Sequence, residues 1–130
     1  RLEIILDTYL SVNTPVQRSL ASWFPLRHSI QKEIKDRIQN NLAFLRSCLT
    51  QPHPVHCLPL EAGWYAILRL PRTKSEEEWA LEFLDQDRVY LYPGYFFDFE
   101  QEAFVVVSLL VPCEVFKEGI SRILRRVKSG

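Results

Sequence analysis

The 130-residue sequence has no methionine, only four glycines and no long apolar run. About 20 consecutive apolar residues are needed to cross a bilayer, so we expect no membrane-spanning segment and no membrane partner. The amino end carries Glu3 and Asp7, whereas a secretory signal begins with basic residues. Because methionine is missing even at position 1, we expect the chain to be a piece of a longer protein.

An excess of charge is also missing, since 16 Lys and Arg residues balance 16 Asp and Glu residues. The basic residues near the carboxyl end lack a wider basic face, so we expect no nucleic-acid partner. The three cysteines include no Cys-x-x-Cys pair, and reduced thiols in a cytoplasmic protein are the simplest interpretation. A hydrophobic share of 47% with 25% charged residues is typical of a soluble globular domain.

Residue types that carry chemistry are sparse. His53, His56 and Cys57 lie within five residues of each other. Zinc sites usually draw their ligands from two separated pairs, and no second pair is present, so we interpret this segment as a structural loop without a metal. No glycine-rich phosphate loop and no His-Glu-x-x-His pattern occurs. The residues therefore indicate no catalytic site within this chain.

The stretch from residue 63 to residue 111 predicts the central elements of the fold. Apolar and aromatic runs at 64–70, 89–92 and 104–111 predict three strands, because glycine or proline residues bound them. Ser75 followed by Glu78 is a capping box, which predicts a helix to about residue 86. Pro112 opens a final helix that runs to about residue 127. We predict an α+β fold of two layers with a short, mainly antiparallel sheet.

Helices are predicted for most of the chain before Gly63. Residues 1–10 and 15–24 form short helices, and Asn13 or Thr14 caps the second one. Residues 26–49 form a long amphipathic helix, and residues 50–62 are an extended connector interrupted by prolines. The long helix is predicted to have a continuous buried stripe, which consists of Leu26, Ile30, Ile34, Ile38, Leu42, Leu45 and Leu49. We divide the chain into residues 1–25, 26–62 and 63–130.

The first 24 residues are more apolar than such short helices require for themselves. Their large apolar side chains are Leu2, Ile5, Leu6, Tyr9, Val16, Leu20, Trp23 and Phe24. Exposing such surface to water is unfavourable, at roughly 25 cal/mol per Å². We expect this segment to bury itself against another molecule or against the rest of the chain.

A loop at residues 93–99 is unusually aromatic, with Tyr95, Phe96 and Phe97 in a row. One interpretation makes this loop a hydrophobic plug over the edge of the sheet. The other makes it a wall of a ligand pocket, because exposed aromatic loops often mark contact surfaces. The residues alone leave both interpretations open.

In order and spacing, these features resemble the carboxy-terminal part of the class I/II, fold-type I, pyridoxal-phosphate-dependent aminotransferases. The resemblance rests on residues 7–17, the long helix, the run Gly-Trp-Tyr-Ala-Ile-Leu-Arg-Leu-Pro at 63–71, Pro93-Gly94 and a strand that ends near Ser108. It implies that residues 1–25 leave a large cofactor domain, that residues 26–62 cross from it, and that residues 63–130 form the small domain.

The resemblance also implies amino-group transfer between an amino acid and a 2-oxo acid. Pyridoxal phosphate would be bound by a lysine upstream of this chain, so the piece alone would be inactive and would bind no cofactor. The implied partners are the large domain of the same chain, a second subunit in a homodimer and the small-molecule substrates. Tyr95, Phe96, Phe97 and Val106 are the candidates for the substrate pocket.

Val106 departs from the family pattern, which usually places a carboxylate-binding arginine two residues before the serine of the third strand. Valine cannot bind a carboxylate, so the substrate or its mode of binding would differ. The alternative hypothesis, from a different class, is a non-catalytic α/β module that binds a ligand or a partner protein.

Overall fold

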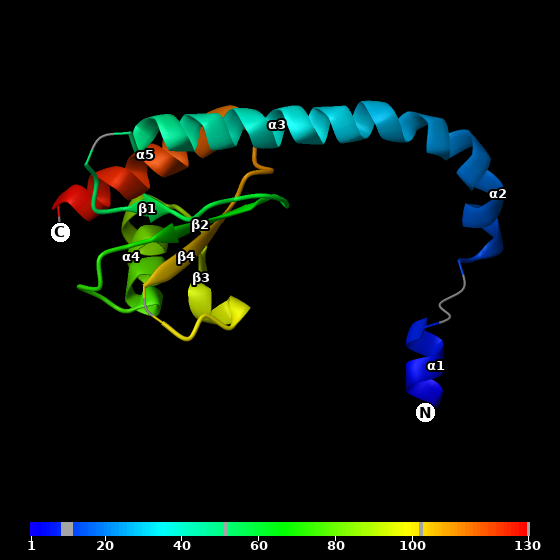
Figure 1. The fold of residues 1–130 in the computed structure, drawn as a ribbon, viewed down its shortest axis with the longest axis horizontal. Helices are drawn as coiled ribbons and strands as arrows, with labels where there is room; N and C mark the ends of the chain where they lie inside the picture. Colours follow the sequence, from blue (N-terminus) through cyan, green and yellow to red (C-terminus); the bar gives the residue numbers. More distant parts are fainter. Residues whose placement is uncertain (9–11, 51, 102, 130) are drawn as a thin grey trace. The chain divides into compact units, whose positions relative to one another are not determined.

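The computed structural model describes residues 1–8, 12–50, 52–101 and 103–129. The chain divides into two compact units, Arg1–Glu33 and Ile34–Gly130, which we treat separately (Figure 1). The predicted three-part division at residues 25 and 62 remains a prediction.

The first unit consists of short helices. Helix α1 spans Leu2–Thr8, α2 spans Thr14–Trp23 and the 3₁₀ helix η1 spans Phe24–Leu26. Asn13 is confirmed as the cap of α2, since its Oδ1 accepts a hydrogen bond of 3.1 Å from the Val16 backbone N–H. Pro15 then lies in the first turn, where a missing N–H is tolerated.

Most of the apolar side chains expected to be buried in this unit are exposed. Leu20, Trp23 and Phe24 are 46%, 54% and 52% exposed. Leu2 and Ile5 are also exposed, and Val16 is half-buried. Tyr9 and the side chain of Leu6 lie outside the described residues. The described helices of the first unit therefore do not bury these side chains among themselves.

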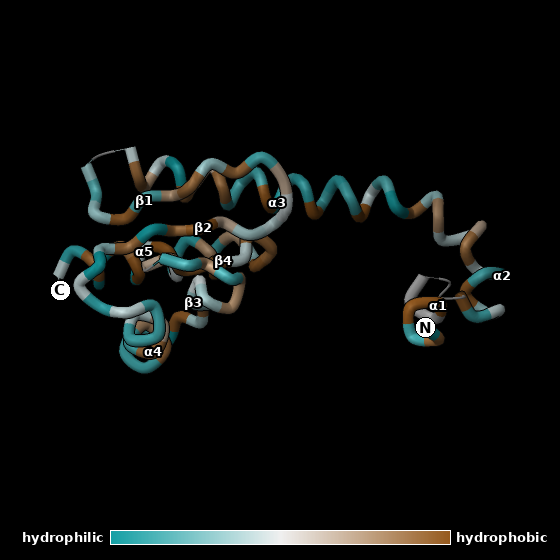
Figure 2. Tube along the Cα trace, turned by 60° about the horizontal axis from the view of Figure 1, so that its bottom comes forward, coloured by the Kyte–Doolittle hydropathy of each residue, from teal (hydrophilic) through white to brown (hydrophobic). Residues whose placement is uncertain are grey.

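Helix α3 (Arg27–Cys48) confirms the predicted long helix. The prediction of a continuous buried stripe is wrong for its first half, because Leu26, Ile30 and Ile34 are exposed. Ile38 and Leu42 pack partly buried against the core, and Leu45 is fully buried. Apolar and polar residues alternate along the helix (Figure 2). None of the described helices combines the length and the apolarity needed to cross a membrane.

The second unit contains a four-stranded antiparallel sheet in the order β1-β2-β4-β3. The strands are β1 (His56–Cys57), β2 (Tyr65–Arg69), β3 (Tyr92–Pro93) and β4 (Phe104–Ser108). Helix α4 (Glu76–Asp87) and the 3₁₀ helix η2 (Gly94–Phe97) lie between β2 and β4 in the chain, and α5 (Cys113–Ser129) follows β4. This architecture confirms the two-layer α+β prediction.

The core lies on one face of this sheet, here called the inner face. Strands β2 and β4 alternate, so that their inner residues are Ala66, Leu68, Val105 and Val107. Helices α3, α4 and α5 cover this face with Leu45, Trp79, Phe83, Phe116, Ile120, Ile123 and Val127. Trp79 and Phe83 stack with ring centroids 5.5 Å apart. All helices of the core cluster thus pack on the same side (Figure 1).

The predicted strands are longer than the observed ones, and one strand was missed. The prediction of a strand at 89–92 is wrong for 89–91, because Arg88 adopts a left-handed conformation and the Val89 N–H still bonds to the Phe83 carbonyl. The third strand ends at Ser108 instead of residue 111. Within the predicted connector at 50–62, His56 and Cys57 pair with Arg69 and Leu68.

Polar side chains of α3 hold the turn between β4 and α5. The buried Asn41 donates two hydrogen bonds of 2.9 Å, to the carbonyls of Leu109 and Val111. Arg37 donates one of 3.2 Å to the Leu110 carbonyl. Three successive backbone acceptors at the end of the central strand are therefore satisfied by one helix, which fixes where β4 ends.

Candidate functional site

The candidate site lies on the other face of the sheet, here called the outer face. Tyr65, Ile67 and Arg69 of β2 point to this face, because the residues between them pack into the core. In the same register, β4 contributes Phe104, Val106 and Ser108 opposite them, and Tyr92 of β3 pairs with Val106. Strand alternation therefore places the predicted site residue Val106 between Ile67 and Tyr92 of the neighbouring strands, with Tyr65 diagonally across from it.

Aromatic side chains connect across the outer face into a continuous series, which we call the ring chain. Its members are Trp64, Tyr65, Phe97, Tyr92, Tyr90, Phe96 and Tyr95. Phe97 joins β2 to β3, since its ring centroid lies 5.9 Å from that of Tyr65 and 6.1 Å from that of Tyr92. Phe96 contacts both Tyr92, at 6.3 Å, and Tyr95, at 4.8 Å. These separations are typical of favourable tilted and edge-to-face pairs.

The structure brings the predicted site residues together unequally. Phe97 is 43% exposed and Val106 is 2% exposed. Tyr92 is the cross-strand partner of Val106, and its ring contacts that of Phe97. The ring of Phe97 thus connects the two strands that lie on either side of β4. Tyr95 and Phe96 lie further out, at 49% and 61% exposure. The loop thus covers Val106 and also presents an exposed aromatic surface, and its interpretation as a wall of a ligand pocket stays a prediction.

A buried carboxylate anchors the aromatic loop. Glu76 of α4 is 3% exposed, and its two oxygens accept hydrogen bonds from the backbone N–H groups of Tyr95, at 2.7 Å, and Phe104, at 2.6 Å. A Cβ atom on Gly94 would lie 2.9 Å from Glu76 Oε1 and 2.9 Å from Phe104 Cβ. Glycine at position 94 therefore allows the close approach that lets Glu76 bind the loop to β4.

One tyrosine of the ring chain has a raised pKa. A hydrogen bond with Tyr90 and the proximity of that hydroxyl raise the pKa of Tyr92, which keeps Tyr92 protonated. Arg69 and His56 are cross-strand partners at the other end of the face, beside Phe104. The outer face thus has an aromatic part and, at its other end, a polar part.

Sequence reasoning missed Tyr65, Tyr92 and Glu76 as site residues. The alternation of apolar residues in the run 64–70 could have placed Tyr65 on one face with Ile67. Glu76 has no such signal, because an acidic residue in the first turn of a helix is ordinary. Its role depends on the distant backbone of Phe104, which only the folded structure places beside it.

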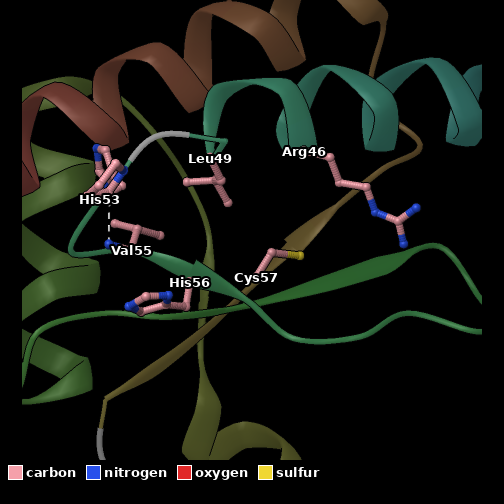
Figure 3. Close-up of a pocket in the computed structure, with 7 residues that line it drawn as sticks. Arg46, Leu49, His53, Val55, His56 and Cys57 are labelled. Carbon is pink, nitrogen blue, oxygen red and sulfur yellow. Dashed lines mark hydrogen bonds between the residues drawn. The ribbon is translucent and has the colours of Figure 1, made fainter.

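A concavity of about 300 Å³ lies between the end of α3 and β1 (Figure 3). Arg46, Leu49, His53, His56 and Cys57 are among the residues that line it. Burial raises the pKa of the Cys57 thiol, more than the nearby Arg46 lowers it, so Cys57 is not an activated nucleophile. No group of three or more potential ligand side chains in the described ranges is placed to hold a metal ion.

His53 has a structural role in the loop before β1. Its Nδ1 accepts a hydrogen bond of 3.0 Å from the backbone N–H of the buried Val55 (Figure 3). This bond requires an unprotonated Nδ1. Burial, the positive charge of Lys128 and the neighbouring His56 lower the pKa of His53, while the backbone carbonyl of Leu124 opposes this shift.

We expect the stability of the chain to fall as the pH drops below about 6.5, the ordinary pKa of histidine. Because the pKa of His53 is lower in the folded state, the unfolded chain binds the proton more readily in this range. The contribution of His53 to the free energy of unfolding is fully present above pH 6.5. It is lost as the pH falls towards the pKa that His53 has in the folded state. Urea unfolding at pH 7.5 and pH 5.5 should show a smaller difference for His53→Gln than for the wild type. A His28→Gln control, at an exposed position of α3, should keep the wild-type difference, and equal differences in all three proteins would contradict this role.

The lysines of the chain do not fit a covalent cofactor site. Lys74 is ion-paired with Glu82, and a hydrogen bond from Lys117 to Glu114 raises the pKa of Lys117. A lysine that forms a Schiff base requires a lowered pKa in a desolvated site. Lys32, Lys35 and Lys128 are exposed. The described residues therefore do not fit covalent attachment of pyridoxal phosphate to this part of the protein.

Neither a family model nor a curated protein matches this sequence. Solved structures do match. LysN, the α-aminoadipate aminotransferase of Thermus thermophilus, is 23% identical with a TM-score of 0.70, over 88% of this chain and 30% of that one. YbdL of Escherichia coli, described as having a methionine aminotransferase function, is 16% identical with a TM-score of 0.71, over 92% and 32%.

The tyrosine aminotransferase of Leishmania infantum is 19% identical with a TM-score of 0.66, over 75% of this chain and 25% of that one. The chain thus corresponds to between 25% and 32% of the length of these three proteins. The shared architecture includes most of the chain, although the identities are low. The chain has the fold of one segment of the fold-type I aminotransferases.

Proposed function

We propose that this chain is the small-domain part of a pyridoxal-phosphate-dependent aminotransferase, in which the outer face forms one wall of the substrate cleft. The single observation that carries the proposal is the ring chain. It gives the outer face several half-exposed aromatic rings, and the buried Glu76 anchors the loop that carries part of them. Small-molecule sites are clefts lined mostly by apolar and aromatic side chains with few polar groups, and this face has the composition of one wall of such a cleft. The similarity of fold to aminotransferases supports the proposed class of enzyme.

In this proposal the chain contributes walls and position, while the reacting groups come from elsewhere. The cofactor would act as the electron sink for amino-group transfer between an amino acid and a 2-oxo acid. The cofactor-binding lysine would belong to a large domain outside these 130 residues. This chain would contribute the apolar surface of Tyr65 and Phe97, which excludes water from the substrate, with Val106 buried beneath the loop. Since Val106 cannot bind a carboxylate, that group would be bound by residues of the large domain or of a second subunit.

We expect reductive labelling to find the cofactor lysine outside this chain. The complete protein would be incubated with pyridoxal phosphate, reduced with borohydride and mapped by mass spectrometry, with the 130-residue chain treated in parallel. One lysine of the complete protein should be labelled stoichiometrically, and none of Lys32, Lys35, Lys74, Lys117 and Lys128 should be. Stoichiometric labelling of one of these five, or no labelled lysine in the complete protein, would contradict the proposal.

The exposed apolar side chains of the first unit favour an additional role in association. In the complete protein we propose that residues 1–24 pack on the large domain or on a second subunit. For the 130-residue chain alone we expect self-association, because Leu20, Trp23 and Phe24 would otherwise stay in water. In sedimentation equilibrium its apparent mass should increase with concentration. A Leu20→Glu, Trp23→Glu variant should remain a monomer, and a monomeric wild-type chain would refute this expectation.

A further inference from the structure

We propose that the ring chain selects substrates with an aromatic or large apolar side chain and disfavours acidic ones, an inference that rests on the proposed function. Three features of the outer face carry it: the free surface of the rings, the lack of a positive charge in the ring chain and the rigid attachment of the loop.

The rings have surface to spare for one more aromatic partner. Tyr65 and Phe97 contact each other but remain 38% and 43% exposed. Their planes are tilted by 59°, so the pair presents one ring face and one ring edge at an angle. A third ring can join such a pair in the offset or edge-to-face geometry that aromatic groups prefer. Beneath them the partly buried Ile67 gives the surface an aliphatic floor.

The ring chain has no positively charged member that could bind an anionic group. The buried Glu76 carboxylate lies behind the loop, bonded to the N–H groups of Tyr95 and Phe104, and Asp98 follows Phe97 in the chain. Arg69 is the cross-strand partner of Phe104, so it lies beside the residue whose N–H Glu76 binds. A second carboxylate against the rings would therefore lose its water without gaining a positive partner there, whereas an uncharged ring would not.

The loop is also fixed in advance of binding. Glu76 ties the backbone of Tyr95 to that of Phe104, and Gly94 leaves no room for a side chain between them. The Asp98 N–H closes η2 onto the Tyr95 carbonyl at 3.3 Å. Because the backbone on both sides of Phe97 is bonded, little conformational entropy is lost when a ligand contacts the ring. Glu76 would thus act as a positioning residue for the aromatic surface.

The inference is tested by equilibrium binding of unreactive carboxylates to the complete protein. Isothermal titration calorimetry would compare 3-phenylpropanoate with propanoate, which lacks the ring, and with succinate, which carries a second carboxylate. We expect 3-phenylpropanoate to bind most tightly of the three ligands, and therefore more tightly than succinate. Phe97→Ala should reduce the preference for 3-phenylpropanoate over propanoate about three- to ten-fold, the size of one aromatic pair. The Kd of propanoate should change less than the Kd of 3-phenylpropanoate.

Leu81→Ala is the matched control, because Leu81 is an exposed apolar residue of α4 outside the ring chain. It should leave all three dissociation constants unchanged. If Phe97→Ala keeps the wild-type preference, if succinate binds more tightly than 3-phenylpropanoate, or if none of the three binds, the inference is wrong. Borohydride labelling of the same sample distinguishes failure of this inference from failure of the proposed function. A labelled lysine outside the chain without aromatic preference would refute only the substrate class.

Discussion

Replacing Glu76 by alanine should lower the free energy of unfolding by about 2–6 kcal/mol, because two partly buried backbone N–H groups would lose their acceptor and each such loss costs about 1–3 kcal/mol. These are the N–H groups of Tyr95 and Phe104, which join the aromatic loop to the central strand. Glu76→Gln should cost less, since the amide oxygen can still accept from one of them. Urea unfolding followed by the fluorescence of the buried Trp79 would measure these changes.

Glu77→Ala is the matched control, because Glu77 is the next residue of the same helical turn and is exposed. Substitutions at such exposed sites usually change stability by less than about 0.5 kcal/mol. If Glu76→Ala and Glu77→Ala destabilised the chain equally, the anchoring role of Glu76 would be refuted.

Arginine at positions 106 and 107 should have very different consequences, although the two valines are adjacent. Val107 points into the core beneath the helices, where an unpaired charge costs about 3–5 kcal/mol, a large part of the stability of a domain. Val106 points to the outer face, where a long side chain can displace the ring of Phe97 and extend to water. We expect Val106→Arg to cost about 1–3 kcal/mol, as overpacking does.

Thermal unfolding of both variants would separate these outcomes, and an equal loss of stability would contradict the assignment of two different faces. In the complete protein, Val106→Arg should also strengthen the binding of carboxylate ligands. Hydrogen bonds to charged groups contribute about 1.5–3 kcal/mol. A folded variant with unchanged affinity for 3-phenylpropanoate and propanoate would contradict the placement of Val106 at the substrate wall.

The elements that local sequence determines were predicted well. The capping box is present in the structure, where Ser75 and Glu78 bond to each other's backbone N–H groups. Strand β2 and helix α5 agree closely with the predicted runs, because turn residues mark their ends. The side of the sheet to which Val106 points follows from strand alternation, but that alternation was hidden by the apolar run 105–107.

Features that depend on distant partners could not be predicted. Strand β1 has two residues, and it forms only because β2 offers an edge for pairing. The amphipathic pattern of α3 shows which residues can be buried but not where a partner is present, so the exposure of Ile30 and Ile34 was missed. The anchoring of the loop by Glu76 joins residues 28 positions apart in the sequence.

The most direct test of the central claim is a crystal structure of the complete protein with 3-phenylpropanoate bound. The account predicts that the phenyl ring lies in van der Waals contact with Phe97 and Tyr65, on the outer face of the sheet. It also predicts that the carboxylate is bound by residues outside this chain. A structure in which another part of the protein covers the ring chain, with the ligand bound elsewhere, would contradict the claim.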